Sequence, residues 1–485
     1  MAYDLNTRWY VNSGAVGASD NNGGGFVPGS SGTDYSQQGA PQFALTGVTS
    51  SGAGNTVLTA SAATTMVGNF INVVSGTNFH TGPFQIASVV AGVSITCDTN
   101  TAGQSISSGV GASGVMNVGG AFLTLTQAVS VAIQNNTINC AGSETRTTTL
   151  TLSLAYSGSA AHFTPYTISG FTTTPGDGGQ FTLQTATNSV NVLTIATAAG
   201  QIKLQNLLIK STAGTPGDGI EAGTSGASYD IFLDNCRITG CHQGIRSPFS
   251  TQYFLVPLTL HNCEIDNCTS DGIITISQLQ MFFCDIRANG GHGVNLQTAA
   301  GQAAAGFTAV GCIFEGNTSD GVNHNTTASS VESSCGAWIL NCVFYNNTGY
   351  GYFLATNGPV SFLFENNILS TNGTGAGSTG NNVIYVGLID RNFYWNNTTA
   401  RNNFITGPND VTGSGDPFNG ASSGDFSLNN TAGAGAACRN AGFPGVLQRG
   451  GTGYADIGAL RHQDAGGGST VVVNVNRTTF VTRRK

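Results

Sequence analysis

Two carboxylates and one imidazole that could act together occur at equivalent places in the sequence. Asp271, His292 and Asp320 each stand directly before a glycine, in DGI, HGV and DGV. Enzymes that hydrolyse glycosidic bonds use two carboxyl groups, and a histidine can transfer protons as a general acid or base. These three residues are therefore the candidate catalytic group, provided that the fold brings them together.

A second charged group follows the cysteines of the same region. Arg237, Glu264 and Asp285 come directly after a cysteine, and further charges two places along are Asp266, Arg287 and Glu315. Glu264 and Asp285 are candidate ligands for a cation or a cationic group. Both groups have a simpler interpretation, because Asp before Gly is common in turns and alternating acids and arginines suit a solvated sheet face.

A repeat of 21 to 30 residues indicates how such distant residues could meet. One cysteine column is formed by Cys236, Cys263, Cys284, Cys312 and Cys342, and a glycine follows each cysteine after eight or nine residues. Around each cysteine, apolar and polar residues alternate, which is typical of a strand with one buried face. A unit this short cannot bury its apolar face alone, but stacked copies can. The sequence therefore predicts a parallel β-helix covering at least residues 200–400.

In such a coil each turn lies about 4.8 Å above the last, so equivalent residues form vertical columns. The cysteines and the isoleucines beside them are expected to point inward. Asn235, Asn262 and Asn341 suit a corner with left-handed backbone, and the glycines suit another corner that requires their conformational freedom. Asp271 and Asp320 would then lie about 9–10 Å apart with His292 between them, near the upper limit for an inverting glycosidase.

The composition excludes several classes of protein. The chain has 485 residues, of which only 8% are charged, and a formal net charge of -8, which argues against nucleic-acid binding. The sequence predicts neither a membrane span nor a signal peptide at MAYDLNTRWYVNSG. The eleven cysteines include no CxxC pair and are expected to be reduced and buried. The histidines lack ligand spacing, so neither a metal nor a cofactor is predicted.

Four regions are expected along the chain. Residues 1–40 form a first strand and a Gly-rich loop, and residues 41–118 form a small β-domain. The β-helix and its closing segment cover 119–464, with a short helix within 122–133 over the first turn. Residues 465–485 form a linker and a basic, strand-like tail. We expect the tail, Val471–Lys485, to pair with another copy or with other virion proteins, the alternative being a frayed terminus.

The repeat, together with DPFNGASSGDFSLNNTAGAGAACRNAG (416–442) and YADIGALRHQD (454–464), resembles the right-handed parallel β-helix proteins of the pectin-lyase-like superfamily. That superfamily includes phage tailspikes and other virion proteins. The resemblance covers about 120–464 and implies a right-handed solenoid. With the segments on either side, the predicted fold is all-β: a right-handed parallel β-helix with a small N-terminal β insertion and an extended C-terminal tail. The calcium-binding aspartates with a nearby Arg or Lys base, and the NTD, DD, HG and RIK set, are absent as such, so the resemblance specifies fold more than function.

We expect a structural virion protein of a bacteriophage: a fibre, a tailspike-like protein or a capsid-decorating subunit, made in the host cytoplasm. Glycan contact would use aromatic side chains, namely Tyr345, Tyr350, Tyr352 and Trp395. The resemblance favours a homo-oligomer, and a trimer above others. Two alternatives remain open: a polysaccharide hydrolase or lyase that uses Asp271, His292 and Asp320, and an extracellular surface protein.

Overall fold

The computed structural model describes residues 8–13, 25–26, 42–45, 47–50, 56–59, 70–80, 82–90, 94–99, 103–106, 114–118, 122–132, 135–152, 165–173, 175–196, 201–222, 230–247, 257–297, 306–325, 336–355, 360–379, 385–443 and 455–460. The chain divides into two compact units. The first consists of residues 1–146, 152–184 and 198–208, and the second of residues 147–151, 185–197 and 209–485. The predicted tail, Val471–Lys485, lies outside the described residues.

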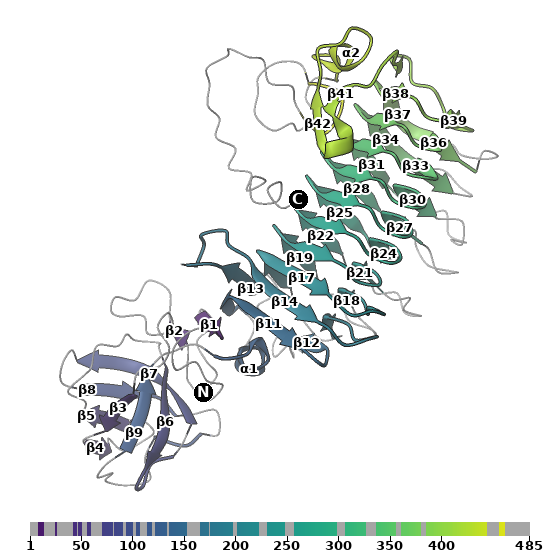
Figure 1. The fold of residues 1–485 in the computed structure, drawn as a ribbon. Coiled ribbons are helices and arrows are strands. Elements are labelled where there is room, and N and C mark those ends of the chain that lie inside the picture. Colours follow the sequence, from purple (N-terminus) through teal and green to yellow (C-terminus); the bar gives the residue numbers. More distant parts are fainter. Residues whose placement is uncertain are drawn as a thin grey trace. The chain divides into compact units, whose positions relative to one another are not determined.

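Part of the first unit is an antiparallel sheet built between residues 42 and 118, where short Val-, Ile- and Thr-rich runs alternate with glycine turns (Figure 1). Its strand order is β3-β9-β6-β7-β8-β5-β4, and Val73, Phe84 and Cys97 are buried in it. The strands are β3 (Gln42–Leu45), β4 (Gly47–Ser50), β5 (Thr56–Thr59), β6 (Phe70–Gly76), β7 (Gly82–Val90), β8 (Ser94–Cys97) and β9 (Gly114–Val118).

The rest of the first unit begins the parallel coil. Its strands are β1 (Arg8–Asn12), β2 (Gly25–Phe26), β10 (Thr137–Ala141), β11 (Ser143–Arg146), β13 (Tyr166–Phe171), β14 (Phe181–Thr185) and β16 (Ile202–Gln205). β1, β10, β13 and β16 pair in parallel, and β2 runs antiparallel along the outer edge of β1. The helix predicted within 122–133 is confirmed as α1 (Leu125–Val131), whose first turn is capped by Thr124.

The second unit is a parallel β-helix with three sheets, each receiving one strand per turn (Figure 1). Sheet 1 contains β19 (Ile231–Asp234), β22 (Leu258–His261), β25 (Leu279–Phe282), β28 (Phe307–Val310), β31 (Gly336–Leu340), β34 (Val360–Glu365) and β37 (Tyr385–Asp390). Sheet 2 contains β17 (Leu207–Ser211), β20 (Arg237–Thr239), β23 (Glu264–Asp266), β26 (Asp285–Arg287), β29 (Ile313–Glu315), β32 (Val343–Tyr345), β35 (Ile368–Ser370), β38 (Phe393–Trp395) and β40 (Val411–Thr412).

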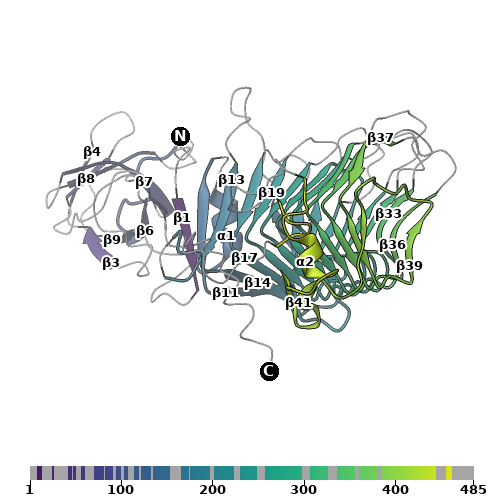
Figure 2. The ribbon, with the colours of Figure 1, turned by 90° about the horizontal axis from the view of Figure 1, so that it is seen from above.

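Sheet 3 completes each turn, and its last three strands lie side by side in Figure 2. It contains β12 (Leu150–Leu152), β15 (Leu193–Ile195), β18 (Ile220–Ala222), β21 (Ile245–Arg246), β24 (Ile273–Thr275), β27 (Val294–Leu296), β30 (Val322–Asn325), β33 (Tyr350–Ala355), β36 (Thr374–Ser378) and β39 (Thr399–Asn402).

The predicted cysteine column is confirmed. The residues that follow the cysteines pair in register from turn to turn, as in Arg237 with Glu264 and Glu264 with Asp285. The five thiols are at most 3% exposed, and neighbouring thiols from Cys236 to Cys342 interact with one another. Burial raises the pKa of the Cys263 thiol, so it stays protonated, in agreement with a structural role.

Two corners of the coil use left-handed backbone. Directly before the cysteine column, Asn235, Asn262 and Asn341 have φ of 53°, 53° and 52°, as predicted. A second left-handed corner, which the sequence analysis did not identify, lies five residues further along each turn. Its members are Gly240, Asn267, Ala288, Gly316, Asn346, Thr371 and Asn396.

The glycine column has a different cause from the one predicted. Its members do not have left-handed φ values, so conformational freedom is not the reason for glycine. A Cβ on Gly272 would lie 2.6 Å from the carbonyl oxygen of Gly293 on the next turn and 2.9 Å from Nδ2 of Asn289. Glycine is required because successive turns approach too closely for any side chain.

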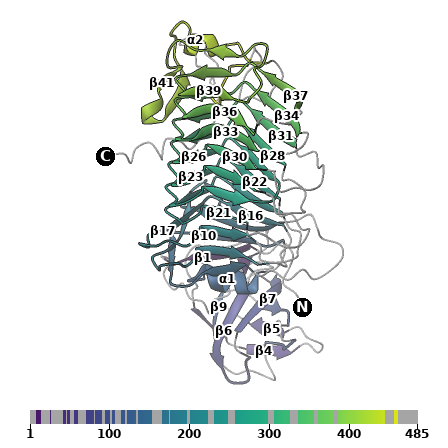
Figure 3. The same cartoon turned by 90° about the vertical axis from the view of Figure 1, so that its right-hand side faces the viewer.

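The outward face of sheet 2 in the last turns is covered by a cap made from β41 (Phe418–Gly420), η2 (Ala421–Ser423), β42 (Asp425–Leu428), α2 (Gly435–Cys438) and residues 455–458 (Figure 3). The outward column of sheet 2 is charged at Arg237, Glu264 and Asp285 but becomes apolar from Ile313 onward. The cap packs on this apolar part, and Nδ2 of Asn341 donates to the carbonyl of Asp456 at 2.9 Å.

Candidate functional site

The coil places Asp271, His292 and Asp320 on consecutive turns at the glycine corner. The N–H of Gly272 donates to the carbonyl of His292 at 2.9 Å, and the N–H of Gly293 donates to the carbonyl of Asp320 at 2.9 Å. The three candidate residues therefore stand one above another, as the column alignment requires.

Both carboxylates in this column are engaged in bonds between turns. Asp271, only 7% exposed, accepts from the backbone N–H of His292 at 2.8 Å and from Nδ2 of Asn295 at 2.9 Å. Asp320 accepts from the backbone N–H of Tyr350 at 2.7 Å, and its other oxygen lies 3.2 Å from Nδ1 of His292. Asp271 thus uses both oxygens to fix the next turn, whereas Asp320 links the turn after it, through Tyr350, to the turn before it, through His292.

The hydrogen bond made by the His292 ring depends on whether its Nδ1 carries a proton. Burial lowers the pKa of His292, but the hydrogen bond to Asp320 and the charges of Asp320 and Asp271 outweigh it, so this pKa lies above 6.5. When neutral at Nδ1, the ring accepts from the backbone N–H of Asp320 at 3.3 Å. When protonated, it donates to Oδ2 of the same residue.

Asp218 stands directly before Gly219 and belongs to the same column, but it was not among the predicted residues. Its Oδ1 accepts from the backbone N–H of Gln243 at 3.3 Å and lies 3.2 Å from Nδ1 of His242. Its Oδ2 lies 3.5 Å from Arg246. The GDGI motif at 217–220 could have revealed it. Because the same bonding recurs at Asp218, Asp271 and Asp320, it is a structural device of the coil.

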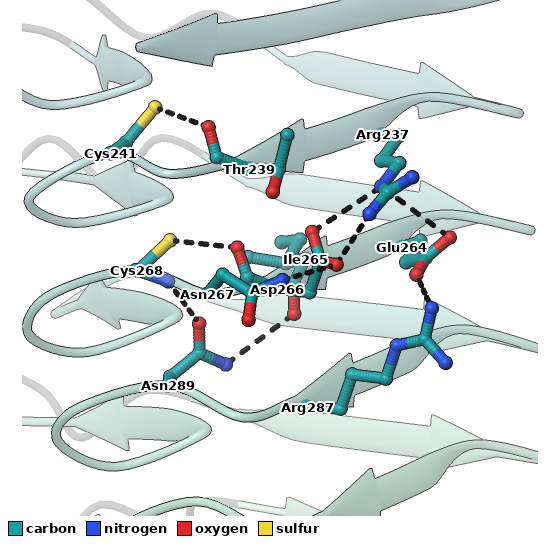
Figure 4. Close-up of polar contacts among 10 residues, drawn as sticks. All are labelled: Arg237, Thr239, Cys241, Glu264, Ile265, Asp266, Asn267, Cys268, Arg287 and Asn289. Carbon is teal, nitrogen blue, oxygen red and sulfur yellow. Dashed lines mark hydrogen bonds and ion pairs between the residues drawn. The ribbon is translucent and has the colours of Figure 1, made fainter. Parts of the chain in front are cut away.

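The second charged group forms ion pairs across three turns of sheet 2 (Figure 4). Arg237 donates two hydrogen bonds to Asp266, at 2.6 and 3.3 Å, and its Nε lies 3.7 Å from Glu264. Glu264 also pairs with Arg287. Within the described ranges, no group of three or more His, Cys, Asp or Glu residues could hold a metal ion. Glu264 is therefore shared between two guanidinium groups, and a ligand role for Glu264 and Asp285 stays a prediction.

The four aromatic residues predicted to contact glycans have different environments. Tyr352 is fully buried, so its predicted role at the surface is wrong: its side chain points into the coil, where its hydroxyl lies 3.1 Å from Nδ1 of His324. Tyr345 and Trp395 pack against the cap. Tyr350 points outward and is partly exposed, and its ring lies 4.7 Å from that of Phe353.

A carboxyl pair on sheet 1 was also missed. Glu365 and Asp390 are register partners on β34 and β37, and they are 3% and 5% exposed. Burial raises the pKa of Glu365, and the charge of Asp390 raises it further while Arg391 lowers it in part. Asp390 is held by the backbone N–H and the side chain of Asn409, at 2.9 and 3.0 Å. Oε1 of Glu365 is buried without a hydrogen-bond partner among the described residues.

Comparison with known proteins supports the coil. Residues 185–335 match the family described as "Right handed beta helix region". No curated protein matches the sequence of this chain. No helix in the ranges given above is long and apolar enough to cross a membrane.

Three solved structures resemble parts of the chain. Pectate lyase Pel9A is 12% identical with a TM-score of 0.39, covering 71% of this chain and 92% of that one. Pectin methylesterase from Aspergillus niger is 13% identical with a TM-score of 0.30, covering 61% and 83%. The tailspike protein gp49 from Pseudomonas phage LKA1 is 11% identical with a TM-score of 0.28, covering 78% and 66%.

Proposed function

We propose that this chain, a right-handed parallel β-helix, is a structural protein of a bacteriophage particle that contacts glycans without cleaving them. One observation carries the proposal. The carboxylates of Asp271 and Asp320, the best catalytic candidates of the sequence, spend all their oxygens on bonds between turns. These bonds stiffen the coil, and carboxylates that are only 7% and 8% exposed and already bonded at both oxygens are poorly placed to exchange a proton with a substrate.

The rest of the molecule fits a rigid part of a particle. Buried thiols and stacked side chains join each turn to the next, so the coil resists local opening. Four of the sixteen basic residues fall in the last nine positions, within Val471–Lys485, and this tail would anchor the chain to another virion protein. The fibre, tailspike-like and capsid-decorating roles all belong to this proposal.

Self-association is part of the same proposal. Trp338, Leu363 and Leu388 are register partners on the outward face of sheet 1, and we call them the apolar stripe. Trp338 is 52% exposed and Leu388 38%. A contiguous apolar surface in water favours a protein contact. We propose that it meets other copies of this chain, in a trimer.

The test is to incubate the purified protein with neutral and acidic bacterial polysaccharides, and to measure both retention and new reducing ends. We expect retention without cleavage, and the same result for Asp271→Asn and Asp320→Asn. New reducing ends that disappear in either variant would refute the structural role. Recovery of the protein from purified phage particles is the expected result for its location, and its absence from every particle fraction would refute that location.

A depolymerase is the second candidate, and the Glu365–Asp390 pair favours it. One carboxyl with a raised pKa beside a second carboxylate is the arrangement of an acid and its partner in glycosidases. If the protein cleaves a polysaccharide, Glu365→Gln should abolish cleavage and Asp271→Asn should leave it unchanged. Loss of activity in Asp271→Asn alone would assign the reaction to the glycine-corner column instead.

A further inference from the structure

We propose that the outward face of sheet 3, between Asn295 and Asn402, binds an uncharged glycan along the coil axis. This inference rests on the proposed glycan contact and gives it a location. We call the surface the amide–aromatic strip, and its residues are Asn295, Asn323, Tyr350, Phe353 and Asn402.

The register places the strip in one line. On successive strands Asn295 pairs with Asn323, Asn323 with Phe353, Phe353 with Gly377 and Gly377 with Asn402. Asn323 and Phe353 are partly exposed and Asn402 is exposed, whereas strand neighbours such as Val322 and Tyr352 are buried, so this part of the column points outward. Asn295 is only 6% exposed and supports the amide of Asn323 at the end of the strip. The three steps of about 4.8 Å from Asn323 to Asn402 give an accessible length of about 14 Å, enough for two or three sugar rings in a row.

Two aromatic rings form the centre of the strip. The rings of Tyr350 and Phe353 lie 4.7 Å apart at 36°, and both side chains are partly exposed. The Tyr350 ring occupies the place of a missing side chain, because a Cβ on Gly377 would lie 2.3 Å from its Cε1. Its hydroxyl accepts from Nδ2 of Asn402 at 3.0 Å. The tyrosine is thereby fixed across the sheet, and a ring held in this way can stack on the apolar face of a sugar at little entropic cost.

Amide groups flank the rings. Nδ2 of Asn295 donates to Asp271 at 2.9 Å, and Nδ2 of Asn323 donates to Oδ1 of Asn295 at 3.2 Å. These bonds orient the amide of Asn323 and leave its Oδ1 available to a hydroxyl donor. On the far side of the rings, Asn402 is exposed and its Oδ1 is likewise an acceptor. Acceptors on both sides of an aromatic centre match the hydroxyl groups around a sugar ring.

The absence of charged side chains in the strip indicates which class of glycan it fits. Its five residues are uncharged, and the carboxylate of Asp271 beneath Asn295 is buried and bonded. Further down the same column, Glu221 and Arg246 form an ion pair at 3.5 Å. An acidic polysaccharide would require cationic side chains, which the strip lacks, so a neutral glycan is the fitting occupant.

The experiment is affinity electrophoresis of the full chain in gels that contain a series of neutral polysaccharides, with polygalacturonate as the acidic probe. The strip variants are Asn323→Ala, Asn402→Ala and Phe353→Leu. Gln280→Ala, outward on sheet 1, is the matched control. We expect retardation by at least one neutral polymer, a loss of at least fivefold in affinity in each strip variant, and no loss in the control. Thermal unfolding of every variant establishes that it is folded.

Three results would overturn the proposal, and they separate it from the proposed function. If both asparagine variants still bind neutral glycan as the wild type does, the strip is not the binding site, while the proposed glycan contact stands. Binding of polygalacturonate alone shows that an acidic ligand is held elsewhere. Wild-type protein that no polysaccharide retards refutes the strip and the glycan contact together.

Discussion

The side chains of Asp271 and Asp320 link successive turns by hydrogen bonds, and the contribution of the Asp271 bonds to stability can be measured. Asp271→Asn keeps an oxygen for the backbone N–H of His292 but turns an amide toward Nδ2 of Asn295, so two donors face each other. We expect a loss of about 1–3 kcal/mol in the free energy of unfolding, the cost of a buried polar group without its partner. Urea denaturation measures it. Asp271→Asn together with Asn295→Asp restores a donor and an acceptor and should recover part of the loss. If stability does not recover, the hydrogen bond between these two side chains does not stabilise the coil.

His292 should make stability depend on pH. Its pKa is raised in the folded protein, so the stability it contributes is fully present below the unfolded pKa of about 6.5. That contribution is lost as pH rises through the folded value. The unfolding free energy of the wild type should therefore exceed that of His292→Gln most at pH 5.5, and the difference should shrink toward pH 9. A difference that grows with pH would show that His292 is not paired with Asp320.

Glu365 changes stability with pH in the same direction as His292, but through its uncharged form. Its folded pKa lies above the ordinary 4.5, so the folded chain holds a proton that the unfolded chain has released. Stability then falls as pH rises from 4.5 through the folded value. Glu365→Gln should match the wild type at pH 4 and exceed it at pH 7.5, as measured by thermal unfolding at both values. A variant less stable than the wild type at pH 7.5 would indicate that the carboxylate has a favourable partner.

The sequence predicts the role of a residue where the same residue type recurs at the same position of successive repeats. Cys236 to Cys342 and the corner asparagines recur, and their places were predicted. Glu365 occurs once in its column, between Leu340 and Asp390, so no periodicity pointed to it. Tyr352 was misplaced because YGY offers two tyrosines two residues apart around a bend, where the pattern of β33 is not a strict alternation. The reason for the glycine column was hidden because close approach between turns leaves no mark in a single repeat.

At the scale of elements, the second left-handed corner is followed by an interior ladder of amides. Oδ1 of Asn317 accepts from the backbone N–H of Asn289 at 3.2 Å and from its Nδ2 at 2.9 Å. Asn317 repeats this arrangement with Asn347 on the next turn. The ladder consists of Asn289, Asn317, Asn347, Asn372 and Asn397, which stand five residues after the cysteine column.

Removing one step of the ladder should weaken the corner on two turns. Asn317→Ala leaves two buried donors of Asn289 without an acceptor, at about 1–3 kcal/mol each. We expect a loss of about 3 kcal/mol in the free energy of unfolding, measured in urea. Gln280→Ala, which removes an outward amide on sheet 1, is the control and should lose less than about 0.5 kcal/mol. Equal losses would mean that the ladder adds nothing beyond a surface amide.

The outward column of sheet 2 indicates which part of the sheet is covered. From the sequence, only the charged part of this column was predicted, at Arg237, Glu264 and Asp285. The apolar continuation, Ile313, Val343, Ile368 and Phe393, marks the part of the sheet that the cap covers. The closing segment was predicted from its own motifs, but its docking face could have been read from this change of polarity, since an outward apolar column in water needs a cover.

At the scale of the molecule, the sequence determines the coil because a vertical spacing of about 4.8 Å brings identical columns into contact. The function is not determined in the same way, since a β-helix is a support on which binding sites differ from protein to protein. The surface that distinguishes this coil is formed by a few outward residues that do not repeat, such as Trp338 and Phe353. Non-repeating residues carry no periodic pattern, and only the register shows which of them are neighbours.

The apolar stripe supplies a test at this scale. Trp338 and Leu388 are exposed on one face of sheet 1, with Leu363 between them in register. Burying them against a second copy would remove apolar area from water at about 25 cal/mol per Å², so association should weaken when they become polar. In sedimentation velocity at micromolar concentration, we expect the wild type to sediment as an oligomer and Trp338→Ser with Leu388→Ser to shift toward the monomer. Gln280→Ala, on the same face but outside the stripe, should behave as the wild type. A double variant that keeps the wild-type oligomer would place the contact elsewhere, and a monomeric wild type would refute self-association through this face.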